Sequence, residues 1–167
     1  EWVKNNDFKK TNEELIYSKL NLKKTQDKIS LFFKKQYKSN PYRPVLNTET
    51  IVSSLKISNK WFDFVMNKLI ENNLFTFCKG GFLVTGYEFE PSRMDQNDFQ
   101  KIRKVFIKSG LSPISYKNVS LKLKIKPNHL SDLMYILENK NDIKNIGNNI
   151  YISTKSLNTI INKVKLF

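Results

Sequence analysis

The sequence predicts a mainly α-helical fold with small β-wings, an α+β class, arranged as two tandem winged-helix domains. Two stretches about seventy residues apart each carry an amphipathic helix, a short helix, a second amphipathic helix and two short apolar runs around a glycine turn. A length of 167 residues with 40% hydrophobic residues suffices for two small cores. The expected divisions are a helical segment at 1–21 that could end an earlier winged helix, winged helices at 22–88 and 89–153, and a helix at 154–167 that could start another.

The first copy opens with a long helical pattern. A capping box at residues 11–14 predicts that a helix begins there. A seven-residue spacing of apolar residues leaves open whether this helix ends near Asn21 or continues toward Lys38, and we expect one break or kink. Because Pro41 disfavours helical geometry in the residue before it, the helix must end by Asn40, and an extended connector follows.

The remainder of the first copy predicts two helices and a hairpin. Asn47 is placed to cap a short helix through Leu55, and Asn59 to cap the next helix, whose apolar stripe is expected in the core. The glycine pair at 80 and 81 supplies the positive φ angles of a tight hairpin. Residues 86–93, which contain a proline, are expected to link the two domains.

The second copy follows the same plan. A helix is expected after Asp95, and Gly110 is placed to end it. Residues 121–126 alternate like a strand, but the repeat places their first three residues at the end of a short helix and their three last residues in a turn. Pro127 then begins the next helix. A further amphipathic helix is expected from Thr154.

Composition points to a polyanionic partner. The formal charge is +14 and the pI about 9.8, which suits nucleic acid because each neutralised phosphate releases counterions. The alternative is that an AT-rich coding sequence accounts for part of the lysine, since 26 of the 29 basic residues are Lys and Ala is absent. No apolar run approaches the roughly 20 residues that span a bilayer, so a cytoplasmic protein without membrane contact is expected.

No catalytic or metal-binding set is visible in the sequence. His129 is the only imidazole and is expected to be a surface or capping residue, and Cys78 to be a small buried hydrophobe. Glu88 and Glu90 are expected to be solvated linker charges, and no Gly-rich phosphate-binding loop opens a helix. We therefore expect a non-enzymatic monomer without a cofactor of its own.

The candidate nucleic-acid contacts lie mainly around the later helix of each copy. Lys122, Lys124 and Lys126 cluster before a helix N-terminus, where backbone amides also favour phosphate, and are the best candidates. Neither later helix carries arginine, which predicts weak sequence discrimination. The complete set of candidates is Lys122, Lys124, Lys126, Asn128, His129, Lys117, Lys60, Lys68, Lys79 and Arg43.

Three segments carry a family resemblance. Residues 33–46, FKKQYKSNPYRPVL, resemble a segment of the bacterial selenocysteine-specific elongation factor (SelB) in which a helix ends in an aromatic–His pair and continues into an Asn-Pro-Leu-x-Pro-Gly-Leu type connector. Residues 119–137 and 149–152 look like that factor's third winged helix and its final wing strand. Tyr37 and Val45 depart from the family's histidine and glycine, a change that a structural element tolerates.

The resemblance implies a part of a larger factor. The chain would be the arm that links the body, which binds GTP with magnesium and selenocysteyl-tRNA, to a last winged helix that reads the selenocysteine-insertion hairpin in mRNA. That last domain would begin at Thr154 and is not expected in this chain. The implied partners are the mRNA hairpin and ribosomal RNA, with the ribosome reached through the parent protein. Two alternatives stay open: a tandem winged-helix DNA-binding protein, such as a replication initiator or transcriptional regulator, and a protein-interaction scaffold.

Overall fold

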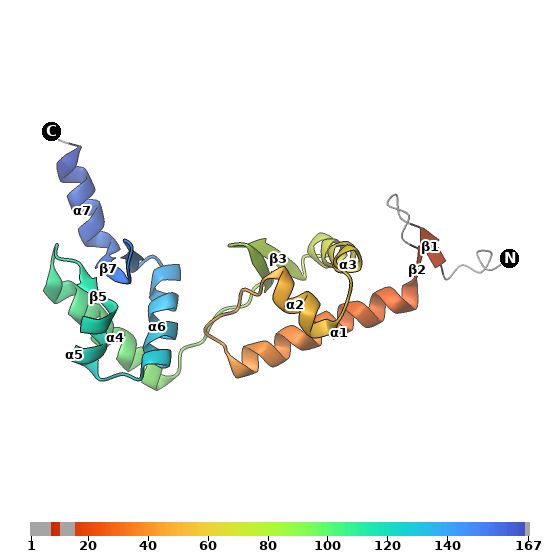
Figure 1. The fold of residues 1–167 in the computed structure, drawn as a ribbon, viewed down its shortest axis with the longest axis horizontal. Helices are drawn as coiled ribbons and strands as arrows, with labels where there is room; N and C mark the ends of the chain where they lie inside the picture. The colour runs from red at the N-terminus through yellow and green to blue at the C-terminus, as the bar shows by residue number, and fades with distance from the viewer. Residues whose placement is uncertain (1–7, 11–15, 166–167) are drawn as a thin grey trace. The chain divides into compact units, whose positions relative to one another are not determined.

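The computed structural model describes residues 8–10 and 16–165. The chain divides into two compact units, unit 1 from Glu1 to Phe89 and unit 2 from Glu90 to Phe167 (Figure 1). In the described residues both units are mainly helical and carry small antiparallel sheets. The division between the units falls inside the proline-bearing segment 86–93. Among the described helices, none combines the length and the apolar character needed to cross a membrane.

Unit 1 contains two hairpins and three helices. Its elements are β1 (Phe8–Lys10), β2 (Ile16–Ser18), α1 (Lys19–Ser39), α2 (Thr48–Leu55), α3 (Asn59–Glu71), β3 (Phe75–Cys78) and β4 (Gly81–Val84). β1 and β2 pair antiparallel, with Phe8 opposite Ser18. The helix expected across residues 16–18 is therefore wrong, and the capping box at 11–14 lies outside the described residues.

The start of α1 explains this difference. Ser18 has extended backbone angles, and its hydroxyl accepts a hydrogen bond from the Asn21 amide at 3.1 Å, so it caps a new helix. From there α1 runs unbroken through Asn21 to Ser39. Its end agrees with the prediction, because Asn40 forms the C-cap and its amide donates to the Gln36 carbonyl at 2.8 Å.

The core of unit 1 lies between α1, α3 and the β3–β4 hairpin. The apolar stripe predicted on α3 is confirmed as core, and Phe33 of α1 packs edge-on to Phe75 of β3 with ring centroids 4.8 Å apart. The fully or almost fully buried side chains are Ile29, Phe33, Ile51, Phe62, Val65, Met66, Leu69, Phe75 and Phe82. Asn47 caps α2 as predicted, whereas Ser58 caps α3 in place of Asn59.

The β3–β4 hairpin is confirmed, but only one of its two glycines lies in the turn. Lys79 and Gly80 form the turn with φ of 50° and 75°, whereas Gly81 already belongs to β4 and pairs with Cys78. A Cβ on Gly81 would lie 2.5 Å from the carbonyl oxygen of Leu46. Leu46 pairs antiparallel with Phe82 of β4, so a third backbone segment lies alongside the hairpin. Cys78 is half-buried, not fully buried as expected.

Unit 2 repeats the three helices and the final hairpin of unit 1 and adds one short strand and one helix to them. Its elements are α4 (Arg93–Ser109), β5 (Ile114–Ser115), α5 (Tyr116–Leu123), α6 (Pro127–Asn139), β6 (Ile143–Asn145), β7 (Ile150–Ser153) and α7 (Thr154–Val164). The three strands form an antiparallel sheet in the order β5-β7-β6. The apolar residues predicted on α4 and α6 form the core, among them Ile102, Phe106, Leu130 and Leu133.

The ends of α4 agree closely with expectation. The helix begins two residues before Asp95, because Ser92 and Asp95 form a capping box with side-chain-to-backbone hydrogen bonds in both directions. Gly110 ends it as predicted, but its φ of 59° is combined with a ψ of −123°, which lies outside the left-handed helical region expected of a terminating glycine. Strand β5 was not predicted, because it pairs with Ile150 and Tyr151 of β7, which lie far along the chain.

The segment that alternates like a strand is helix and turn, as the repeat predicted. α5 ends at Leu123, Lys124 takes left-handed backbone angles, and Pro127 is the first residue of α6. α7 is also present. No residue of α7 is buried, and the helix is attached by hydrogen bonds near its start, including one from the Ser156 hydroxyl to the Gly110 carbonyl at 2.7 Å. Its apolar face is partly exposed, with Val164 68% accessible.

Candidate nucleic-acid interface

The α5–α6 turn gathers three lysines at the start of α6. Lys122 lies in the last turn of α5, Lys124 is the left-handed C-cap, and Lys126 is the N-cap of α6. All three are exposed, and in the described part of the chain none of them forms an ion pair with a carboxylate. Lys117, in the first turn of α5, is also exposed. The structure thus brings together the best phosphate candidates of the sequence.

The backbone of this turn is firmly held. The Tyr116 hydroxyl donates to the Pro127 carbonyl at 2.6 Å, which ties the start of α5 to the start of α6. The Lys124 amide donates to the Ser120 carbonyl at 2.9 Å and continues the α5 hydrogen-bond pattern into the turn. Burial raises the pKa of the Tyr116 phenol, so this donor keeps its proton near neutral pH. The lysine side chains therefore project from a fixed loop.

The N-terminus of α6 adds a favourable field for an anion. Lys126 caps the helix without a side-chain hydrogen bond, and no acidic residue lies in the first turn, where Pro127 lacks the amide that the following residues carry. An uncapped helix N-terminus attracts negative charge through these amides and the helix dipole. Asn128 is exposed beside it. Lysines and helix N-terminus together form a site with the chemistry of phosphate binding.

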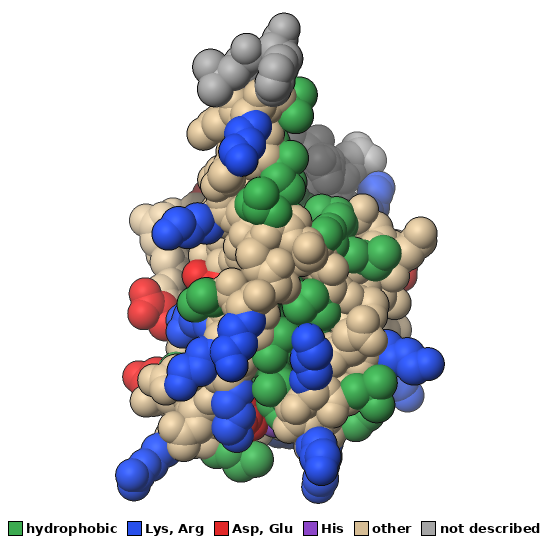
Figure 2. Space-filling view, turned by 90° about the vertical axis from the view of Figure 1, so that its left-hand side faces the viewer, with side chains coloured by type: hydrophobic (Ala, Val, Ile, Leu, Met, Phe, Trp, Pro, Cys, Tyr) green, Lys and Arg blue, Asp and Glu red, His purple; other side chains and the backbone are tan. Residues whose placement is uncertain are grey.

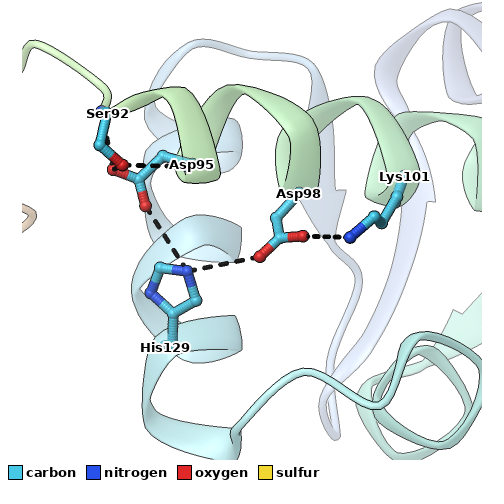
Figure 3. A network of polar contacts seen from close by, with 5 residues as sticks. All are labelled: Ser92, Asp95, Asp98, Lys101 and His129. Atoms are coloured by element: carbon cyan, nitrogen blue, oxygen red, sulfur yellow. Dashed lines mark hydrogen bonds and ion pairs between the residues drawn. The ribbon is translucent and has the colours of Figure 1, made fainter.

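His129 does not take part in this surface, and its prediction as a surface or capping residue is wrong. Its side chain is only 22% exposed and faces α4, with Nε2 at 3.5 Å from Asp95 Oδ1 and 3.6 Å from Asp98 Oδ2 (Figure 3). The two carboxylates are themselves buried. Because the imidazole is used in packing α6 against α4, it is not available for a groove.

The polar network around His129 is a structural link between two helices. Asp95 accepts hydrogen bonds from the Ser92 amide and hydroxyl, at 2.9 and 2.8 Å, and Asp98 pairs with Lys101 at 2.7 Å. Each carboxylate thus has a partner on α4 as well as the imidazole on α6 (Figure 3). Among the described residues, no group of three or more potential ligands is arranged to hold a metal ion.

The candidates on α3 form a weaker surface than expected. Lys60 is exposed, but Lys68 is bound to Glu71 by a 2.6 Å ion pair, and this hydrogen bond raises the pKa of Lys68. Asp63 is also exposed on this helix. The two lysines of α3 are therefore balanced by two carboxylates, so the helix offers no net positive charge to phosphate.

An aromatic cluster also occupies part of α3. Tyr17 of β2 packs on Trp61 and Phe64, with ring centroids 5.9 and 4.8 Å apart, and the Trp61 indole nitrogen donates to the Thr25 hydroxyl at 3.0 Å. The hairpin before α1 thus contacts the helix expected to face a groove. The other two candidates of unit 1 lie elsewhere: Lys79 is exposed in the β3–β4 turn, and Arg43 is exposed in the connector after α1.

The sequence contained a basic surface that motif reading missed. α1 carries seven lysines and one aspartate over 21 residues, and all eight charged side chains are exposed. The signal was compositional, a lysine-rich amphipathic helix. Basic residues are also numerous in unit 2, and on the face drawn in Figure 2 blue Lys and Arg side chains are spread widely with few red carboxylates among them.

No protein-family model and no curated protein sequence matches the chain. Among solved structures, the chain is similar to the crystal structure of a bacterial selenocysteine-specific elongation factor, EF-Sec, with a TM-score of 0.48 and 14% identity. The similarity covers 96% of this chain and 25% of that chain, so the chain spans about a quarter of that protein's length. It concerns the course of the backbone alone.

Proposed function

We propose that this chain is a non-enzymatic segment of two winged-helix units that binds RNA mainly through phosphate contacts. The observation that carries the proposal is the lysine cluster of the α5–α6 turn, formed by Lys122, Lys124 and Lys126. These side chains have no carboxylate partner in the described residues, and they surround an uncapped helix N-terminus. Three like charges in one turn repel each other and so do not stabilise the fold, whereas a bound anion relieves that repulsion.

The assignment as winged helices is supported by the order of elements. Each unit has three successive helices followed by an antiparallel hairpin, and β6–β7 and β3–β4 would be the wings. In helix-turn-helix proteins the turn before the later helix lies close to the nucleic-acid backbone. In unit 2 this position is the lysine cluster.

Phosphate contact, in preference to base reading, is supported by the composition of α6. Its half-buried polar positions include Asp132 and Glu138, and the helix itself contains no lysine or arginine. Base edges are read most often by arginine and by amide side chains. The amide side chains that α6 exposes are Asn128 and Asn139, one at each end of the helix. We therefore expect binding with little sequence preference.

The connector after α1 supports a narrower proposal. Residues 33–46 resemble the corresponding segment of the selenocysteine-specific elongation factor, so the chain would be the arm between the GTPase body and the domain that reads the mRNA hairpin. GTP and magnesium would then be bound by the parent protein, which would act in the cytoplasm with the ribosome and selenocysteyl-tRNA. The arm would add affinity for mRNA or ribosomal RNA without choosing the sequence.

The proposal is tested by fluorescence anisotropy with the 167-residue chain and a labelled RNA hairpin with a stem of about 20 base pairs. Replacement of the cluster, K122Q/K124Q/K126Q, should lower the slope of log affinity against log salt by about 2 to 3, since each phosphate contact contributes roughly 0.9. The matched control is K108Q/K140Q/K163Q, which removes three exposed lysines near the C-terminal ends of α4, α6 and α7.

Two outcomes would count against the proposal. Equal weakening by both triple variants would mean that only net charge matters and that the turn is not a contact site. Tighter binding to a DNA duplex than to the RNA hairpin, at the same salt concentration, would favour the DNA-binding alternative.

A further inference from the structure

The longest helix of unit 1 concentrates lysine on one side. α1 buries only Ile29 and Phe33 of its 21 residues. With about 100° of rotation per residue, five lysines fall within roughly 60° of the direction opposite to these two core residues. They are Lys24, Lys28, Lys34, Lys35 and Lys38, and each of them is exposed. We call this group the α1 lysine face.

The charges of the α1 lysine face are not neutralised within the unit. In the described part of the chain none of the five lysines forms an ion pair. The one carboxylate on the same side of the helix, Asp27, lies 3.9 Å from the ammonium group of Lys23. Five lysines and one aspartate give this side of the helix a net charge of about +4. The exposed pair of Lys23 and Asp27 contributes little at that distance. Such a face favours a polyanion over a protein surface of mixed charge.

Apolar exposure on this face is small. Leu20 and Leu31 are the exposed hydrophobic residues on the same side, 63% and 53% accessible, and lysines separate them. A surface that docks another protein would show a continuous apolar centre with charges at its rim. On the α1 lysine face the two exposed leucines are isolated among lysines, so the surface suits a nucleic-acid backbone as a partner better than a protein.

The alternative contact helix of unit 1 is less suitable. α3 has no net charge, because Lys60 and Lys68 are balanced by Asp63 and Glu71, and Tyr17 packs over part of it. In unit 2 the corresponding helix begins in an uncapped N-terminus beside lysines, whereas in unit 1 Ser58 caps α3 by accepting from the Trp61 amide. The two repeats therefore present their positive charge on different elements.

We propose that unit 1 contacts the phosphate backbone of the bound RNA through the α1 lysine face and not through α3. This inference rests on the proposed RNA binding and assigns a second, separate contact surface to it. Lys24 and Lys38 are fourteen residues apart, about 21 Å along the helix axis at 1.5 Å per residue. At the spacing of a B-form strand, about six phosphates fall within that length, which is enough for one contact by each of the five lysines.

The test compares two triple variants of unit 1 that change the net charge equally. K24Q/K28Q/K35Q removes charge from the α1 lysine face, and K56Q/K60Q/K68Q removes it from the region of α2 and α3. Affinity for the same labelled RNA hairpin is measured between 50 and 200 mM salt with the 167-residue chain. All substituted side chains are exposed or half-exposed. Urea unfolding of each variant is the control that checks whether unit 1 still folds.

The expected result for the α1 variant is a salt slope lower by about 2 to 3, so its loss of affinity should be about 16- to 64-fold greater at 50 mM than at 200 mM salt. The α3 variant should change both quantities much less. The variant K24R/K28R/K35R, which keeps the charge, should bind like the unsubstituted chain.

The outcomes separate the two proposals. If the unsubstituted chain shows no salt-dependent binding to the hairpin, the proposed function fails, and this inference fails with it. If the chain binds and K122Q/K124Q/K126Q weakens binding, but the α1 variant equals the α3 variant, only the present inference is overturned. A larger loss in the α3 variant would overturn it as well and would assign the contact to α3.

Discussion

Replacement of Gly81 by alanine examines how tightly the hairpin of unit 1 is packed against the connector. A Cβ at this position would lie 2.5 Å from the Leu46 carbonyl oxygen and 2.8 Å from Val45 Cγ1. An ordinary carbon–oxygen contact is about 3.3 Å or longer, so the Leu46 backbone would have to retreat by roughly 0.8 Å. That movement is opposed by two hydrogen bonds between Leu46 and Phe82, of 3.0 and 2.8 Å.

The cost follows from these contacts. Weakening two backbone hydrogen bonds costs about 1 to 3 kcal/mol, and relief of the overlap adds at least about 1 kcal/mol. We therefore expect G81A to lower the free energy of unfolding of unit 1 by about 2 to 4 kcal/mol. The control is G80N, one residue away in the turn that precedes β4. Gly80 has φ of 75° and open space where a Cβ would be, and asparagine tolerates that geometry, so the loss should stay below about 1 kcal/mol.

Tryptophan fluorescence during urea unfolding gives the measurement. Trp61 lies in α3 of unit 1 and the sequence of unit 2 contains no tryptophan, so a change in the Trp61 signal reports on unit 1. With a urea dependence of about 1 kcal/mol/M, G81A should lower the midpoint by about 2 to 4 M or leave unit 1 unfolded, and G80N by under about 1 M. A G81A midpoint within 0.5 M, as an order-of-magnitude margin, of the unsubstituted chain would refute the close approach of Leu46 to the hairpin.

Two further predictions concern polar groups in the two cores. Burial raises the pKa of Tyr37 to about 12, so between pH 10 and 12 its phenol ionises in the unfolded chain first, and the stability that this group gives unit 1 is complete below pH 10 and falls as the pH rises to 12. In urea unfolding followed by tryptophan fluorescence, Y37F should lose less stability over that pH range than the unsubstituted chain. An equal loss in both would exclude Tyr37 as its cause. H129L should lower the free energy of unfolding of unit 2 by roughly 1 to 3 kcal/mol, measured by circular dichroism, because Asp95 and Asp98 lose their partner on α6. The control N128L, at an exposed neighbouring position, should change it little. Equal effects of the two variants would contradict the role of the imidazole.

The elements that sequence reading predicted well depend on local signals. Asn47, Gly110 and Pro127 act through their own backbone geometry or through a neighbour within four residues, so caps and helix ends could be placed from the sequence. The left-handed turn at Lys124 needed the comparison of the two repeats, because the local alternation of residues 121–126 favoured a strand. The apolar stripes on α3 and α6 fixed the cores.

The failures depend on partners that are distant in the sequence. Strand β2 replaces the expected helix at 16–18, where Tyr17 packs on aromatic residues of α3 more than forty positions away. Strand β5 is two residues long and exists through its pairing with β7. No local pattern reveals either contact.

The candidate site was predicted only in part for the same reason. The lysines of the α5–α6 turn are exposed as expected, because turn residues before a helix point to solvent. His129 faces two carboxylates of α4 that the sequence did not connect with it, and Lys68 is engaged by Glu71 three residues on. The α1 lysine face could have been found from the composition of the helix alone.

The account depends on phosphate contacts by lysines of both units, and the salt dependence of RNA binding tests this most directly. For the 167-residue chain and the labelled hairpin, log affinity should fall linearly with log salt, with a slope of about −3 or steeper if four or more lysines contact phosphate. Removal of either lysine group should make the slope shallower. Tight binding that does not change between 50 and 200 mM salt, or no binding at 50 mM, would contradict the account.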